Sequence, residues 1–179
     1  ETQWFVTGSI GQSQAKALFT LPANTQLISR TWDDRDTSYS IGGGFRYVDF
    51  SFILSYEQLG EATASYTGDV LDVEQFHQAL ADKAPKLAEG FSLKSEYTFW
   101  QSETLSASIG LGLIAWDSDY SSVLGDSVIT KDQSDTNLFY TAALAYQLTE
   151  KTQLSVQATR YKLLMNDVDN IALALRYHF

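Results

Sequence analysis

Apolar side chains recur at every second position in eight separate segments, and this period restricts the fold more than any other feature of the chain. A period of two is that of a β-strand, whose successive side chains point to opposite faces of a sheet. The segment from Phe91 to Phe99 is typical, because its odd positions are mostly apolar and its even positions are polar or charged. The eight segments are residues 4–10, 38–47, 50–57, 91–99, 105–115, 138–147, 153–159 and 170–179. The sequence therefore predicts an all-β protein with eight strands.

The connections between these segments alternate in length. Three are hairpin-sized turns, around 48–49, 100–103 and 148–151, and four are longer, at 11–37, 59–90, 117–136 and 162–169. Short turns on one side and long loops on the other are typical of bacterial outer-membrane barrels. Strands of roughly nine to eleven residues are long enough to cross a bilayer at a tilt. The pattern predicts an eight-stranded antiparallel up-and-down transmembrane β-barrel with short periplasmic turns and long extracellular loops.

Composition and charge exclude several other classes of protein. Hydrophobic residues make up 44% of the 179 positions, yet no unbroken apolar run exceeds five residues. A membrane-spanning helix needs roughly 20 such residues, so helical spanning is excluded. The chain has no cysteine, which excludes disulfides, thiolate metal sites and a cysteine nucleophile. A net charge of -10 argues against nucleic acid as a partner. We expect residues 1–179 to form a single barrel domain.

A soluble β-sandwich or lipocalin-like barrel would also alternate, but it would turn its apolar face inward. Here the second face is mostly small and polar, which suits the narrow interior of an eight-stranded barrel. Aromatic residues on the apolar face lie near the strand ends, where membrane barrels have interfacial girdles. At the short-turn end they are Trp4, Tyr47, Phe50, Tyr97, Phe99, Tyr146, Tyr177 and Phe179, and at the other end Tyr39, Tyr56, Phe91 and Tyr140. These positions favour the membrane barrel.

Three stretches resemble the small OmpA-type outer-membrane barrels. GGGFRYVDFSFILSYEQLG (42–60) is similar to the second hairpin of that family, and GLGLIAWDSDY (110–120) to one of its glycine-rich strands. VDNIALALRYHF (168–179) resembles the C-terminal assembly signal, with Tyr177 and Phe179 as its aromatic pair, although Ala174 replaces a usual glycine and Ala172 a frequent polar residue. The resemblance implies a place in the outer membrane of a Gram-negative bacterium, insertion by the barrel assembly machinery, and contact with outer-membrane lipids and lipopolysaccharide. It covers nearly the whole chain, so we expect no periplasmic peptidoglycan-binding domain.

Five charged side chains fall on the inward face by parity: Arg46, Glu57, Lys94, Glu96 and Arg176. An unpaired charge in a water-poor interior is costly, so we expect these groups to pair across the lumen. The resemblance implies an interior ion-pair network that blocks a continuous pore. A gated proton or ion path is the functional alternative, because ionisable groups within a membrane are candidates for function.

Catalytic and metal sites have less support in the sequence. A serine hydrolase or acyl transferase would need a histidine near the outer rim. His178 is expected at the periplasmic edge, and His77 lies with Phe76 in a stretch, 72–83, that predicts a short amphipathic helix. Asp117 and Asp119 in the third long loop could offer oxygens to a cation, but solvated loop acids are the simpler interpretation. We therefore predict no enzymatic activity, no cofactor and no resident metal.

The function that these expectations favour is a structural or surface-interaction role: membrane integrity, adhesion, or docking of a partner through the extracellular loops. Asp117, Asp119, Phe76 and His77 are the candidate loop contacts, and an extracellular protein or polysaccharide is the partner class. The four long connections carry -9 of the net charge of -10. A closed sheet has no edge that demands a partner, so we expect a monomer. The alternatives are a small ion or solute channel and, with less support, a lipid A-modifying enzyme.

Overall fold

The computed structural model describes residues 2–16, 25–33, 35–60, 62–70, 88–124, 127–163 and 166–179. Every regular element in these ranges is a β-strand, and none of the described residues forms a helix long and apolar enough to cross a membrane. The strands are β1 (Thr2–Lys16), β2 (Thr25–Asp33), β3 (Arg35–Tyr47), β4 (Phe50–Gln58), β5 (Ala62–Val70), β6 (Glu89–Gln101), β7 (Leu105–Leu124), β8 (Ser127–Gln147), β9 (Thr152–Leu163) and β10 (Asn166–His178).

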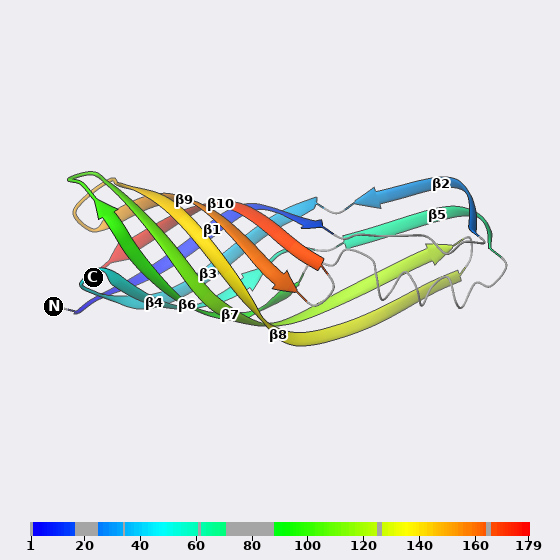
Figure 1. Ribbon diagram of the computed structural model, residues 1–179, viewed down its shortest axis with the longest axis horizontal. Coiled ribbons are helices and arrows are strands. Elements are labelled where there is room, and N and C mark those ends of the chain that lie inside the picture. Colours follow the sequence, from blue (N-terminus) through cyan, green and yellow to red (C-terminus); the bar gives the residue numbers. More distant parts are fainter. Residues whose placement is uncertain are drawn as a thin grey trace.

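Eight of these strands form a closed antiparallel barrel (Figure 1). Going around the barrel, the order is β1, β3, β4, β6, β7, β8, β9 and β10. β10 then pairs with β1 in a register that runs from Phe5 opposite His178 to Lys16 opposite Asp167. Closure leaves no open edge in the barrel wall. A bilayer requires this, because its core contains no water to bind unpaired backbone N–H and C=O groups. The predicted fold class is confirmed.

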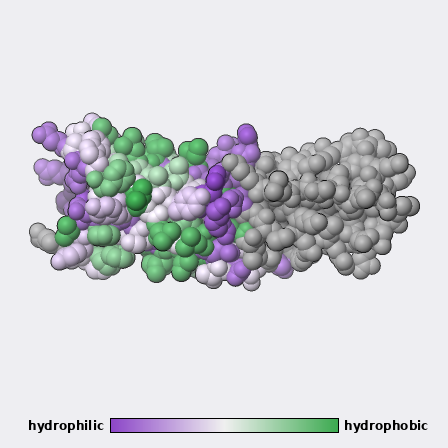
Figure 2. Space-filling model, viewed as in Figure 1, coloured by the Kyte–Doolittle hydropathy of each residue, from purple (hydrophilic) through white to green (hydrophobic). Residues whose placement is uncertain are grey.

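The outward face of the barrel is apolar and its inward face is mostly not. Along β4, for example, Phe52 and Leu54 are exposed while Ser51, Ile53 and Ser55 are buried. On the face shown in Figure 2, hydrophobic side chains form a band across this part of the molecule, between hydrophilic margins. An apolar surface this extensive is far larger than the patches of soluble monomers. We call this band the apolar belt, and it places the eight strands across a membrane.

On the side away from the termini, the strands continue past the apolar belt (Figure 1). β7 and β8 stay paired as far as Leu124 and Ser127, through most of the region predicted as the third loop. β2 and β5 pair with each other inside the first two predicted loops, and β5 runs parallel to β7. We call β2, β5 and the parts of β7 and β8 within 117–136 the extracellular sheet.

The prediction of four long loops was therefore wrong in extent. β1 and β3 also reach into the first loop, the fourth shrinks because β9 continues to Leu163 and β10 begins at Asn166, and several strands exceed eleven residues. Apolar alternation marks only strands that face lipid on one side. Outside the membrane, backbone hydrogen bonds hold a ladder together without that pattern. The helix predicted at 72–83 lies outside the described residues.

The turn between β3 and β4 holds a strained residue. Val48 has φ 56°, and it is the non-glycine residue with a positive φ in the described ranges. A β-branched side chain in this left-handed region is a steric outlier. Nε of Arg46 donates a hydrogen bond of 2.9 Å to the carbonyl oxygen of Val48, so the surrounding structure holds the turn in place.

Val48→Gly is expected to raise the free energy of unfolding by about 1 kcal/mol, because glycine adopts a positive φ without this strain. Urea unfolding of the protein in detergent micelles, followed by tryptophan fluorescence, measures the change. Leu148→Gly, in the turn between β8 and β9 where φ is negative, is the matched control. It should lower stability, because glycine there only adds freedom to the unfolded chain. Equal effects of the two substitutions would contradict the assignment of strain to Val48.

Candidate functional site

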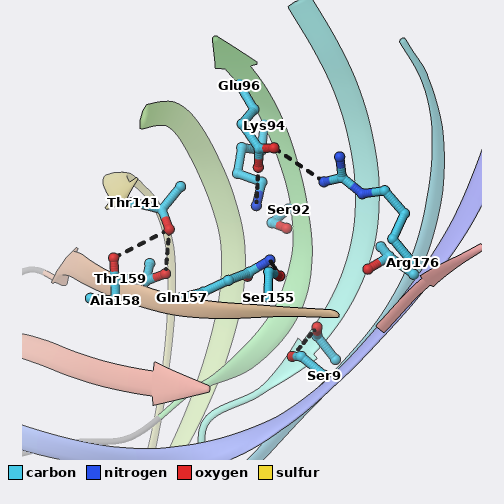
Figure 3. A network of polar contacts seen from close by, with 12 residues as sticks. Ser9, Ser92, Lys94, Glu96, Thr141, Ser155, Gln157, Ala158, Thr159 and Arg176 are labelled. Atoms are coloured by element: carbon cyan, nitrogen blue, oxygen red, sulfur yellow. Dashed lines mark hydrogen bonds and ion pairs between the residues drawn. The ribbon is translucent and has the colours of Figure 1, made fainter. Parts of the chain in front are cut away.

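Three charged side chains meet inside the barrel, toward the end that holds the termini. Lys94 and Glu96 occupy neighbouring inward positions on β6, and Arg176 projects from β10 on another part of the wall. Nη2 of Arg176 donates to Oε1 of Glu96 at 3.2 Å, and Nζ of Lys94 lies 3.3 Å from Oε2. Figure 3 shows the Glu96 carboxylate between the two cations. We call these three residues the charged cluster, and Glu96 is 5% exposed.

Aromatic rings complete the packing at this end. The guanidinium carbon of Arg176 lies 4.3 Å from the centroid of the Phe5 ring, a cation–π contact. The ring of His178 lies 5.4 Å from the same Phe5 ring, and both residues are buried. His178 is therefore inside the barrel and remote from the extracellular side, where a lipid-modifying base would be needed.

The other two residues of the predicted network lie elsewhere. Arg46 donates to the carbonyl of Val48 and, at 2.9 Å, to Oε1 of Gln101, so it joins two periplasmic turns. Glu57 lies toward the opposite end of the lumen, where Oγ of Ser92 donates to it at 2.5 Å and the hydroxyl of Tyr161 donates to its second oxygen. The single five-residue network expected from the sequence is thus a three-residue cluster and two separate sites. The odd or even place of a residue along its strand decides whether its side chain faces the lumen. Its height along the barrel depends on how the neighbouring strands are aligned.

Apolar side chains fill the lumen at the extracellular end. They are Leu59, Ala88, Ile114, Trp116, Phe139, Tyr161, Leu163 and Val168, and none is more than 5% exposed. The rings of Phe139 and Tyr161 lie 5.1 Å apart, and Nε1 of Trp116 donates to Oδ1 of Asn137 at 2.7 Å. We call this group the apolar plug. The plug was not predicted from the sequence, although Ile114 and Phe139 are apolar residues on an otherwise small and polar face.

Between the plug and the charged cluster, the lumen is lined by short polar side chains that bond to one another. Ser9 and Ser40 share a hydrogen bond of 2.7 Å, and Thr159 donates to Thr141 at 2.9 Å. Figure 3 shows part of this network. The cavity enclosed there has a volume of about 30 Å³, room for about one water molecule. Among the described residues, these packed side chains leave little space in this section of the lumen.

The remaining predicted site residues were expected in the long loops. Asp117 is exposed on β7, and Asp119 is opposite Asp132 in the backbone register of β7 and β8. Phe76 and His77 lie outside the described residues. No group of three or more His, Cys, Asp or Glu side chains in the described ranges is arranged to hold a metal.

The aromatic pair of the predicted assembly signal lies on the outer surface. The rings of Tyr177 and Phe179 meet edge to face with centroids 5.6 Å apart, and the side chains are 42% and 67% exposed. Both rings are therefore available to lipid or to another protein at the end of the barrel that carries the short turns. Their role as a signal stays a prediction.

Three solved structures are similar to the chain over nearly its whole length. Neisserial surface protein A has a TM-score of 0.63 and 14% identity, covering 98% of this chain and 97% of that one. Ail, the attachment invasion locus protein of Yersinia pestis, in complex with the heparin analogue sucrose octasulfate, has a TM-score of 0.58, 16% identity and coverage of 100% and 99%. The N-terminal β-barrel domain of OprF from Pseudomonas aeruginosa has a TM-score of 0.55, 16% identity and full coverage of both chains.

Neither a protein-family model nor a curated protein matches the sequence. At these identities the similarity establishes the fold, and it agrees with the closed barrel, the apolar belt and the aromatic residues at the strand ends. The chain therefore has the fold of the small eight-stranded outer-membrane β-barrels.

Proposed function

We propose that the barrel is a membrane scaffold and that the extracellular sheet carries a surface-interaction role, adhesion or the docking of a partner, alongside a contribution to membrane integrity. The observation that carries this proposal is the continuation of the β7–β8 ladder, with β2 and β5 in the same sheet, beyond the apolar belt. A strand rises about 3.3 Å per residue, so the part of β7 from Asp117 to Leu124 extends roughly 25 Å. A paired sheet presents its surface more rigidly than an open loop, and rigidly placed extensions are where function lies on such scaffolds.

The negative charge of the extracellular segments favours some classes of partner over others. Segments 59–90 and 117–136 each sum to -4. A surface of this sign attracts a basic protein face and repels a sulfated glycan. Ail was crystallised with a heparin analogue, but a polyanion of that kind does not fit the acidic sheet of this chain. We therefore favour a protein partner with a basic surface.

Two other functions have weaker support. A channel needs a continuous aqueous path, whereas the apolar plug, the charged cluster and a cavity of about 30 Å³ leave little space in the described lumen. A lipid-modifying enzyme needs a base near the outer rim, and the described histidine, His178, is buried at the opposite end.

The test removes the outer part of the extracellular sheet and keeps the barrel. Replacing residues 119–132 with an Asn-Gly turn rejoins the strands at Ser118 and Gln133, which are opposite each other in register, and Asn-Gly suits a two-residue hairpin. Bacteria displaying either protein would be assayed for attachment to cultured epithelial cells, to beads coated with cytochrome c as a basic probe, and to heparin beads. We expect the shortened variant to lose at least about tenfold in attachment to cells and cytochrome c, with heparin beads bound by neither protein.

Heat-modifiable migration of both proteins in gels would verify that the barrel folds. Replacing Thr149 and Glu150 of a periplasmic turn with Asn-Gly is the matched control, and it should leave attachment unchanged. Undiminished attachment by the shortened variant would refute the proposal, and so would stronger binding to heparin than to cytochrome c. Steady single-channel currents from the wild-type protein in planar bilayers would support the channel instead.

A further inference from the structure

The extracellular sheet joins the barrel at a step between two neighbouring strands. β4 pairs with β6 up to Gln58 opposite Glu89, and β6 pairs with β7 up to Glu89 opposite Asp117. Beyond this level β5 takes the place of β6 beside β7, beginning with Ala62 opposite Tyr120. The chain therefore continues in the direction of β4 and moves sideways by one strand between Gln58 and Ala62.

The dimensions of a β-sheet leave few conformations for this step. Adjacent strands lie about 4.8 Å apart, and β7 rises about 10 Å from Asp117 to Tyr120, so the direct path across the step is about 11 Å. The chain from Gln58 to Ala62 spans at most about 14 Å when fully extended. The step is therefore made by a nearly extended chain with one sharp turn.

Gly60 makes this turn. Its φ is 93°, a left-handed conformation that residues with a Cβ rarely adopt. A Cβ on Gly60 would also lie 2.4 Å from Cβ of Asp36, at the start of β3. The backbone amide of Thr37 donates to Oδ1 of Asp36 at 2.7 Å, which orients this neighbouring side chain. Both the backbone conformation and the available space therefore require glycine here.

The chain just before this turn is fixed from inside the lumen. Leu59 is 1% exposed within the apolar plug, and its amide donates to the carbonyl oxygen of Ala88 at 2.8 Å. Glu57 accepts a hydrogen bond from the hydroxyl of Tyr161 on β9, which lies on the opposite side of the barrel from β4. The end of β4 is therefore held both by packing and by a hydrogen bond across the lumen.

We propose that Glu57, Leu59 and Gly60 form an anchor that positions the extracellular sheet for partner binding. β5 starts just after this anchor and β2 joins the sheet through β5, so the anchor sets the place of both strands beside β7. Figure 1 shows both strands beyond the barrel, on the side away from the termini. A surface held in place loses less conformational entropy on binding than a loose one. The role in binding rests on the function proposed above, whereas the placement of β5 does not.

Hydrogen–deuterium exchange of the full chain in lipid nanodiscs, measured by mass spectrometry, tests the placement of β5. In Gly60→Ala we expect the amides of β5 to exchange at least about tenfold faster than in the wild type, with those of β9 unchanged. Gly8→Ala is the matched control, because the nearest atom to a Cβ there is the carbonyl oxygen of Ser40 at 3.7 Å. Its β5 amides should exchange as in the wild type.

Two substitutions of Glu57 test the hydrogen bond across the lumen. Glu57→Gln keeps an acceptor for the hydroxyl of Tyr161, so β5 should exchange as in the wild type. Glu57→Leu removes the acceptor, and we expect β5 to exchange at least about threefold faster. The glutamine variant thus separates the effect of the hydrogen bond from that of the charge.

Attachment of displaying bacteria to beads coated with cytochrome c connects the anchor to partner binding. We expect Gly60→Ala and Glu57→Leu to attach at least about fivefold less than the wild type. Gly8→Ala and Glu57→Gln should attach equally to the wild type. If Gly60→Ala does not fold, as heat-modifiable migration would show, the two Glu57 variants provide the same comparison.

Unchanged exchange of β5 in Gly60→Ala or Glu57→Leu would overturn the proposal. Equal acceleration in β9 would also overturn it, because it would indicate a general loss of barrel stability. Full attachment by a variant whose β5 exchanges faster would show that the anchor has no role in binding. If the wild-type protein binds no basic surface while β5 exchange follows the expectation, the proposed function fails and the placement of β5 by the anchor is still supported.

Discussion

Glu96→Ala is expected to lower the free energy of unfolding by about 3–5 kcal/mol, the usual cost of removing one partner from a buried ion pair. The substitution leaves Lys94 and Arg176, with side chains 12% and 11% exposed, without the carboxylate between them. Two buried like charges then repel each other in a region with little water. Urea unfolding in detergent micelles or lipid vesicles measures the loss, and Glu103→Ala in an exposed periplasmic turn is the control.

A second variant separates charge from packing. In the triple variant Lys94→Met, Glu96→Leu, Arg176→Met, all three charges are replaced by apolar groups of similar size, and such replacements are often neutral or stabilising. We expect the triple variant to recover most of the stability lost in Glu96→Ala. If the single variant unfolds at the same urea concentration as the wild type, the charged cluster has no role in stability. Neither variant is expected to conduct steadily, because the apolar plug remains.

Phe139→Ala should cost about 3–5 kcal/mol, because it removes a large ring from the middle of the apolar plug. Phe139 is 1% exposed and packs against Tyr161, so its loss leaves a cavity that the stiff barrel wall cannot close. Leu144→Ala, on the outward face of the same strand, is the matched control. There, lipid chains fill the space, and we expect a smaller loss. The same unfolding assay compares the two, and equal losses would show that the plug is not a packed core.

Much of this fold could be predicted from the sequence, because the membrane imposes a simple rule. Each strand that meets lipid must turn apolar residues outward at every second position, and β4 and β6 obey the rule almost without exception. The extracellular sheet could not be predicted in the same way. Strands β2 and β5 lie outside the bilayer, where no solvent asymmetry imposes alternation, and their pairing rests on backbone hydrogen bonds that the sequence does not display.

The sequence predicted which residues face the lumen but not their height along the barrel axis. Glu57 and Glu96 both fall on the inward face by parity, yet one binds hydroxyl groups at the extracellular end and the other binds cations at the periplasmic end. The difference comes from the register between neighbouring strands, which no single strand encodes. The apolar plug was missed for a related reason, since its members are separated in the sequence by up to about a hundred residues and become one cluster only in the closed barrel.

The pairing of β1 with β10 has a kinetic consequence. The hydroxyl of Thr7 donates to the carbonyl of Leu175, a partner 168 residues away in the sequence, and the other contacts of this seam are of similar range. Contacts of such range form late, because a long stretch of chain must lose its freedom before they contribute. The charged cluster depends on the same event, since Arg176 reaches Glu96 only when the final strand is in place. We therefore expect assembly to be cooperative. A barrel with seven strands inserted has an incomplete ring of backbone hydrogen bonds and a Glu96 carboxylate without Arg176, and the last strand supplies both partners.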